Sequence, residues 1–502
     1  MEFATFPKNL AYNIKTLSGF SKTTVKLTPE RTSVQKGDTF KVKLPSNTLV
    51  DLRTLSFFAK GTCENAGANP LHFPRLTSSL IKTLAIYING TLIERIDNYN
   101  ILYNKLYDLD GGGIDQIAKR HLEIADPSIR YTVAADHTNG SPEITTSSAT
   151  SRDVNRKLAI NNWIGFLSSV SCPCLDTNDF GSMDIEITLA DEKILWAGAN
   201  DATVANFSTV APVITGANWK LDEVHFTISK IVFNDPLYYN MKASKLLSSG
   251  LQIGYQTYIA SKNSVVQKGT SVNVNCTVNS TSLDQLICCY NPEAPAIAQL
   301  QLFGSNDTND SLSFQQVLSG HSKTIVSTVV PATFAALSAA TTAKFGEITP
   351  IGGQSSVNAF DNSAGDLYNQ SVFFKSDATD LRTSSIEINN TPLMPQPLED
   401  YEVYNETLIA LGNNNLDMGS GVHPGCNSLS AFLKYYFCHV VSLENIQNGD
   451  FYKSGLDGKA SALNIVWKSV YNSASGNVTP YIFAKTTRIV QVNEGHSVVV
   501  IV

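Results

Sequence analysis

Long runs of basic residues are missing from this sequence. Its 37 Lys and Arg side chains are scattered and are outnumbered by 44 Asp and Glu, which gives a net charge of −7. A protein of this charge exerts no long-range attraction on a phosphate backbone. We therefore expect no direct, sequence-specific binding of nucleic acid.

A basic region followed by an apolar run is also missing from residues 1–7. We expect no signal peptide and a cytosolic or nuclear origin. Residues 325–343 carry no charge over a length that could cross a membrane, but they include Pro331 and are mostly Ser, Thr and Ala. This stretch is too polar to be predicted as a membrane span.

Cysteine and histidine do not occur at the spacings of disulfide frameworks or metal sites. The eight cysteines are scattered, and a reducing compartment would keep them as thiols. The eight histidines include no H-x-H or H-E-x-x-H. Cys172 and Cys174 could supply two thiolates, but a metal would need a second pair, such as Cys288 and Cys289, to meet them in space. We expect ordinary thiols and no metal site.

Two loops resemble catalytic motifs without completing one. Residues 417–423 place Asp, Ser and His in one loop, whereas triad members normally come from separated elements, and Ser420 lacks a G-x-S-x-G elbow. Residues 110–113 are Asp-Gly-Gly-Gly without the Gly-Lys-Ser/Thr of a phosphate-binding loop, and they predict a helix stop. The sequence therefore predicts no catalytic, cofactor-binding or metal-binding residue, no cofactor and no enzymatic activity. A paired-carboxylate hydrolase stays open, because its two acids need not be neighbours in sequence.

What the sequence does contain favours a large all-β protein. Apolar residues make up 43% and charged residues 16% of 502 residues, enough to bury more than one core. Thr, Ser, Asn and Val are abundant, which suits half-buried strands joined by polar turns. We expect two domains.

Short blocks recur in the same order in both halves of the chain, which predicts two homologous β-domains. In each half the blocks predict an entering strand, a hairpin, a short helix and closing strands. They are Val-Gln-Lys-Gly at 34–37 and 266–269, apolar strands after Asp51 and Asp284, Ile-x-Ile-Asn-x-Thr at 86–91 and 386–391, Tyr-Asn at 103–104 and 404–405 within helices 99–109 and 401–411, and strands 183–189 and 230–232 matched by 463–467 and 488–490.

The spacing of the blocks sets the expected domain organisation. We predict an amino-terminal arm at 1–25, a first domain at 26–235 and a second at 236–502, with long outward-facing insertions near 110–180 and 291–384. The last six residues form a dense apolar run, which should be paired or covered because a free strand of this kind aggregates.

The strand at 50–61, the Phe-Pro-Arg loop at 73–75, the hairpin at 86–91 and the segment Tyr-Asn-Ile-Leu-Tyr-Asn at 99–104 carry a family resemblance. In these motifs and in its tandem β-domains the chain resembles the double jelly-roll major capsid proteins of polinton-like viruses and virophages. The resemblance implies two tandem eight-stranded jelly rolls with short helices and long loop insertions.

It also implies a function: a structural protein whose homotrimers form pseudo-hexagonal capsomers of an icosahedral double-stranded DNA virus shell. The expected partners are neighbouring capsomers, penton proteins and minor or cement proteins. The expected location is the virion, after assembly in the host cytoplasm or nucleus. The sequence leaves open whether a membrane underlies the shell.

The alternative is a two-domain β-sandwich protein that binds carbohydrate or attaches to a host, because fold alone does not decide function. Trp side chains would be needed for sugar stacking, yet the four Trp lie mainly in apolar strand contexts, which predicts core packing. They are Trp163, Trp196, Trp219 and Trp467.

Overall fold

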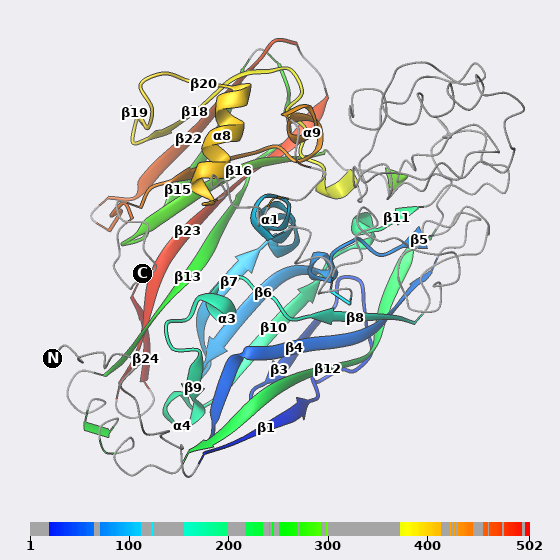
Figure 1. Ribbon diagram of the computed structural model, residues 1–502, viewed down its shortest axis with the longest axis vertical. Helices are drawn as coiled ribbons and strands as arrows, with labels where there is room; N and C mark the ends of the chain where they lie inside the picture. Colours follow the sequence, from blue (N-terminus) through cyan, green and yellow to red (C-terminus); the bar gives the residue numbers. More distant parts are fainter. Residues whose placement is uncertain are drawn as a thin grey trace, which may run out of the picture.

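Two β-sandwiches follow one another along the chain (Figure 1). The computed structural model describes residues 20–64, 71–111, 122–123, 155–197, 216–233, 240, 243–244, 250–269, 271–292, 298–299, 372–412, 422, 426, 429–444, 455–459, 461–473, 476–493 and 497–501. Each sandwich has two antiparallel sheets. We name them the long sheet and the short sheet, after the length of their longest strands.

The first long sheet has the strand order β1-β12-β4-β8, with β2 beside β12 and β9 beside β4. The first short sheet has the order β3-β10-β6-β7. The strands are β1 (Phe20–Leu27), β2 (Val34–Gln35), β3 (Thr39–Lys43), β4 (Leu49–Glu64), β6 (Ile81–Ile88), β7 (Thr91–Asp97), β8 (Arg156–Ile160), β9 (Cys174–Asp176), β10 (Met183–Leu189) and β12 (Asn218–Phe233).

The second sandwich repeats the order of the four main strands in each sheet, and the additional strands β9, β20 and β24 occur in one sandwich only. Its long sheet is β13-β23-β16-β21 with β14 and β24 beside β23, and its short sheet is β15-β22-β18-β19 with β20 beside β18. The strands are β13 (Leu251–Lys262), β14 (Val266–Gln267), β15 (Val272–Val278), β16 (Leu283–Pro292), β18 (Leu381–Ile388), β19 (Thr391–Pro392), β20 (Leu398–Glu399), β21 (Cys438–Ser442), β22 (Leu463–Tyr471), β23 (Asn477–Asn493) and β24 (Ser497–Ile501).

Two facing four-stranded sheets connected in this order make a jelly roll. The prediction of two tandem jelly rolls is confirmed. The matched blocks occupy matched places: Val34 pairs with Leu221 on β12, and Val266 pairs with Val478 on β23. The exact domain boundaries at 26–235 and 236–502 stay a prediction.

Local chemistry explains the strands and hairpins. In β10 and β15 every second residue is buried, as the alternation of apolar and polar residues requires for strands that cover a core. The turns after β6 and β18 have positive φ at both central residues, 48° and 78° at Asn89 and Gly90, and 52° and 65° at Asn389 and Asn390. Such angles suit a two-residue hairpin, and Asn and Gly tolerate them.

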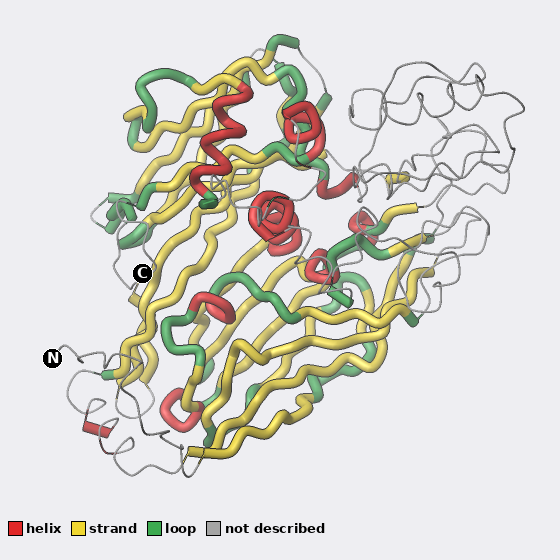
Figure 2. The backbone as a smooth tube through the Cα atoms, in the orientation of Figure 1, coloured by secondary structure: helices red, strands yellow, loops and turns green. Residues whose placement is uncertain are grey.

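Short helices lie among the strands (Figure 2). The two predicted helices are present as α1 followed by the π-turn η3, and as α8, whose amino terminus has a capping box of Glu399 and Glu402. None of the helices in the described part of the chain is long and apolar enough to cross a membrane. The helical elements are η2 (Thr77–Leu80), α1 (Tyr99–Leu106), η3 (Tyr107–Gly111), α3 (Phe166–Ser169), α4 (Thr177–Phe180), η5 (Glu192–Ile194), η6 (Val372–Phe374), α8 (Asp400–Ala410) and α9 (Leu429–Tyr435).

The limits of the arm and of the insertions need correction. Residues 20–25, predicted as arm, belong to β1, which pairs with Phe226–Phe233 of β12 along its whole length. The range 110–180 contains β8 and β9, which pair with β4, and 291–384 contains the first residues of β18. Pairing with strands far away in sequence decides these segments. Residues 1–19, 124–154 and 300–371, including 325–343, lie outside the described residues.

The apolar carboxyl terminus is paired, as predicted: residues 497–501 form β24 against Ile489–Asn493 of β23. A further small sheet joins the two halves, with the order β17-β11-β5. It consists of β5 (Leu71–His72), β11 (Trp196–Ala197) and β17 (Ala298–Gln299).

Candidate functional site

The two jelly rolls meet along a junction of polar and aromatic side chains. Strand β13 lies against α3: the Gln256 amide donates to the Ser169 hydroxyl at 2.8 Å, and the Ser171 amide donates to the Gly254 carbonyl at 2.8 Å. The Tyr255 ring packs edge-on against Phe166, with ring centroids 5.0 Å apart. The second jelly roll is thus held to the first by backbone and side-chain contacts.

A buried carboxylate lies at this junction. Glu94 of β7 accepts hydrogen bonds from the Phe166 amide, at 3.0 and 2.9 Å to its two oxygens. The Thr257 hydroxyl and the Arg488 charge of the second jelly roll also stabilise its ionised form. Burial outweighs these contacts and raises the pKa of Glu94 to about 7. The fit is close, since a Cβ on Gly165 would lie 2.4 Å from a Glu94 oxygen.

Helix α1 lies between the two jelly rolls and is held by buried charges. The Lys105 ammonium donates to the Phe374 carbonyl at 2.7 Å, across the junction. Just beyond the end of the helix, the Asp108 carboxylate accepts a hydrogen bond from Arg75, and both side chains are almost completely buried. The Arg75 guanidinium also lies 5.0 Å from the centre of the Tyr107 ring. Buried charges are tolerated only when paired in this way.

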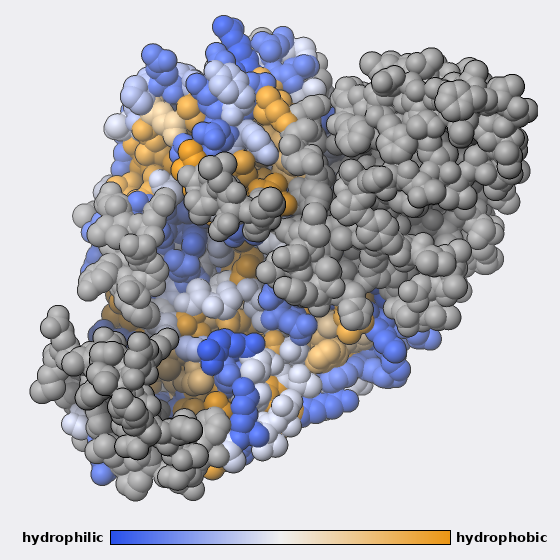
Figure 3. Space-filling model, in the orientation of Figure 1, coloured by the Kyte–Doolittle hydropathy of each residue, from blue (hydrophilic) through white to orange (hydrophobic). Residues whose placement is uncertain are grey.

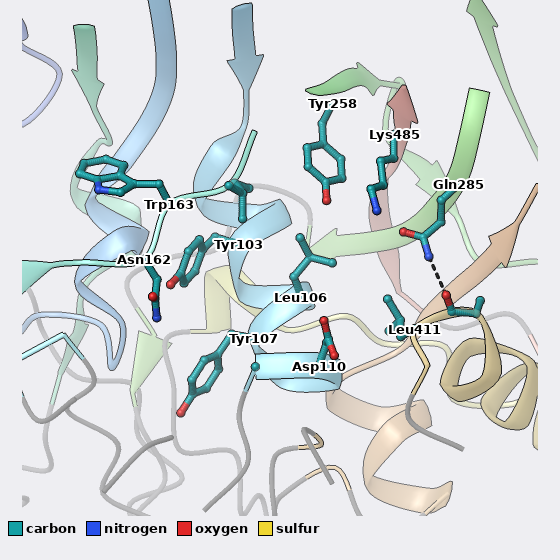
Figure 4. Close-up of a pocket in the computed structure, with 13 residues that line it drawn as sticks. Tyr103, Leu106, Tyr107, Asp110, Asn162, Trp163, Tyr258, Gln285, Leu411 and Lys485 are labelled. Carbon is teal, nitrogen blue, oxygen red and sulfur yellow. Dashed lines mark hydrogen bonds between the residues drawn. The ribbon is translucent and has the colours of Figure 1, made fainter. Parts of the chain in front are cut away.

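A cavity of about 340 Å³ opens beside α1 (Figure 4). Tyr103, Leu106 and Asp110 line it from the first jelly roll, and Tyr258 and Lys485 line it from the second. Burial, followed by the Asp110 charge, raises the pKa of the Tyr258 hydroxyl well above its ordinary value. The cavity is therefore a mixed polar and aromatic space formed only where the two jelly rolls meet.

A serine and a histidine lie together in the second core. The Ser384 hydroxyl is 2.8 Å from His439 Nδ1 and accepts from Trp467 Nε1 at 2.9 Å. All three side chains are buried, and burial lowers the pKa of His439 to about 4. A neutral, fully buried imidazole with no access for substrate stabilises the core and is unsuited to catalysis.

The two cysteine pairs that the sequence offered as possible metal ligands do not lie together in the structure. Cys172 is exposed and Cys174 half-buried on β9 beside Asp51, whereas Cys288 and Cys289 lie buried within β16. Among the residues that the structure describes, no three His, Cys, Asp or Glu side chains could hold a metal. Asp110 lies in η3; the loop 417–423 falls outside the described residues except for Val422.

Sequence reasoning missed the junction residues. Glu94 and Lys105 look like exposed charges on a strand and a helix. Residues distant in sequence bury them: Phe166 of the first jelly roll and Thr257 of the second contact Glu94, and Lys105 contacts Phe374 of the second. The one available signal was that α1 carries apolar residues on more than one face, which is typical of a helix covered on both sides.

Comparison with solved structures identifies the fold. The chain is similar to the PBCV-1 virus capsid protein, with 12% identity, a TM-score of 0.52 and coverage of 98% of this chain and 99% of that one. It is similar to PBCV-1 VP54 as fitted into a reconstruction of the virophage Sputnik, with 11% identity, a TM-score of 0.53 and coverage of 98% and 99%. It is also similar to the Faustovirus major capsid protein, with 8% identity, a TM-score of 0.52 and coverage of 97% of this chain and 93% of that one.

No protein-family model matches the sequence, and no curated protein is similar to it in sequence. The likeness is therefore one of fold, and it extends over both jelly rolls and nearly the whole length of each chain. The chain has the double jelly-roll fold of viral major capsid proteins.

Proposed function

We propose that this chain is the major capsid protein of a double-stranded DNA virus and that three copies form a pseudo-hexagonal capsomer. The observation that carries the proposal is the identical strand order of the two jelly rolls, together with full-length similarity to capsid proteins. Two similar domains per chain, taken three at a time, form a nearly sixfold ring, and such rings tile a closed shell.

The proposed role is structural and not enzymatic. The buried polar groups described above join the jelly rolls or fill their cores, and they require no substrate. The proposed partners are neighbouring capsomers, penton proteins and minor or cement proteins, and the proposed location is the virion. The net charge of −7 favours assembly through apolar and backbone contacts over attraction to nucleic acid.

The carbohydrate-binding alternative gains no support from the three tryptophans whose side chains the structure describes. Trp163, Trp219 and Trp467 are buried, and Trp163 and Trp467 donate their indole N–H groups to Leu55 and Ser384. Their faces are therefore not available for stacking on a sugar.

The purified full chain tests the proposal by size-exclusion chromatography with light scattering, followed by electron microscopy. We expect particles of three times the mass of one chain, with a hexagonal outline, that assemble further into shells or sheets as the concentration rises. A stable monomer at every concentration would contradict the proposal and favour an attachment protein.

A further inference from the structure

Matching strands of the two jelly rolls differ in how completely they are buried. Strand β16 is buried over every residue from Leu283 to Asn291. Strand β4, in the same position of the first long sheet, alternates between buried and partly exposed residues over most of its length. Among the described residues, β16 is thus covered on both faces, and most of β4 is covered on one.

The cover on the second long sheet includes α1 of the first jelly roll. Gln285 of β16 lines the same cavity as Leu106, and the Lys105 charge acts on the Cys289 thiol. Among the described residues, the outer face of the first long sheet keeps partly exposed side chains. Phe58 of β4 and His225 of β12 stack there with centroids 5.4 Å apart and remain partly exposed.

The matching helices differ in the same way. In α1 every residue from Tyr99 to Lys105 is buried, whereas in α8 only Val403 and Thr407 are. The uncovered side of α8 has Tyr401 54% exposed and Ile409 37% exposed. The surface around α8 accordingly carries hydrophobic and hydrophilic residues side by side (Figure 3).

The two surfaces also carry single charges that can pair with one another. Helix α8 carries Asp400, Glu402 and Glu406 and no basic residue. In β1, Val25 and Leu27 pack on the core, so Lys22 and Lys26 point to the outer face of the first long sheet. Lys22 pairs with Asp51 of β4 at 3.4 Å, whereas Lys26 is in none of the ion pairs of the described residues. A carboxylate of α8 and the Lys26 ammonium would attract one another.

We propose that α8 of one copy packs against the outer face of the first long sheet of a second copy. This contact repeats, between copies, the junction that α1 and the second long sheet make within one chain. It is a head-to-tail contact, because each copy contributes a different surface, and head-to-tail contacts close into a ring when the rotation allows. The proposal rests on the proposed function, for which it names the surfaces that join the three copies.

Cross-linking between distinguishable copies tests the polarity of the contact. One copy carries Ile409→Cys and the other, with a size tag, carries Lys26→Cys, both in a Cys172→Ser background that removes the exposed thiol. With a short bis-maleimide we expect cross-linked species that contain one copy of each type, and none from either variant alone. Cross-linking of the Ile409→Cys copy to itself would show a symmetric contact and overturn the proposal.

Charge reversal tests it without cross-linking. Glu406→Lys and Lys26→Glu should each weaken association of the copies by about tenfold or more, measured by light scattering across a dilution series. The double variant should recover most of the loss, because the opposite charges face each other again. Recovery would not follow if the two residues lay in separate surfaces.

Ile409→Arg should also prevent association, whereas Leu456→Arg, at a residue of similar exposure elsewhere in the second jelly roll, should not. Circular dichroism must show that every variant is folded. If the wild-type chain forms trimers and the α8 and β1 variants do so equally well, the inferred surfaces are wrong while the proposed function stands. If the wild-type chain does not associate at all, the proposed function itself fails.

Discussion

The hydroxyl of Tyr255 in the second jelly roll donates to the backbone carbonyl of Ile93 in the first, at 2.8 Å. Ile93 belongs to β7, the edge strand of its sheet, so this bond satisfies a carbonyl group that water would otherwise have to reach. The Tyr255 side chain of the second jelly roll therefore caps the edge of the first short sheet at the junction.

Tyr255→Phe tests the contribution of this bond. We expect the free energy of unfolding to fall by about 1 kcal/mol, because one buried hydrogen bond is lost while the packing of the ring on Phe166 is kept. Urea titration followed by fluorescence measures the change. Tyr87→Phe, at a half-buried tyrosine of the first short sheet, should change stability by less than about 0.5 kcal/mol.

The pKa of Glu94 predicts how stability depends on pH. Burial raises this pKa from 4.5 to about 7, so the folded protein holds the proton more tightly than the unfolded chain does. Stability contributed by Glu94 is therefore fully present below pH 4.5 and is lost as the pH rises to about 7, by up to about 3 kcal/mol. Melting temperatures between pH 5 and pH 8 measure the loss.

Glu94→Gln should flatten this part of the pH profile, because a neutral amide still accepts from the Phe166 amide. His439 acts in the opposite direction. Burial lowers its pKa from 6.5 to about 4, so its contribution is lost as the pH falls through that window, in wild type and variant alike. An unchanged slope between pH 5 and pH 7 in Glu94→Gln would rule out Glu94 as the titrating group.

Ser384→Ala tests the polar cluster of the second core. The hydroxyl meets both Trp467 Nε1 and His439 Nδ1, so its removal leaves two buried nitrogen atoms without this partner. We expect a loss of roughly 2–4 kcal/mol in the free energy of unfolding, measured by urea titration. Ser385→Ala, at the half-buried neighbour, should cost less than about 0.5 kcal/mol.

Asn390→Gly should stabilise the second hairpin. Asn390 has φ 65°, a backbone conformation that asparagine tolerates but that glycine adopts at a lower cost, and the first hairpin has glycine at the matching position, Gly90. We expect a gain of up to about 1 kcal/mol, seen as a higher melting temperature. Gly90→Asn should give a shift of opposite sign, and two shifts of the same sign would contradict the explanation.

Local features of this protein were predictable from the sequence. The hairpins at Asn89 and Asn389, the alternating strands and the two short helices follow from residue type and spacing over a few positions. Their repetition in the same order predicted two homologous β-domains, and the family resemblance implied that these domains are jelly rolls. The start of β1 was missed because its partner β12 lies far along the chain, and a polar strand of this kind shows little pattern without its partner.

The sequence by itself determined the elements and their duplication, because turn geometry and side-chain alternation act between near neighbours. Only the tertiary structure decided which of two equivalent surfaces is covered. Helix α1 is buried against the second jelly roll and helps to cover β16, whereas among the described residues α8 and β4 keep partly exposed faces, although the matching four-strand orders are identical. Burial of Glu94 and Lys105 likewise follows from tertiary packing, since desolvation depends on which side chains lie nearby in space and not on neighbours in sequence.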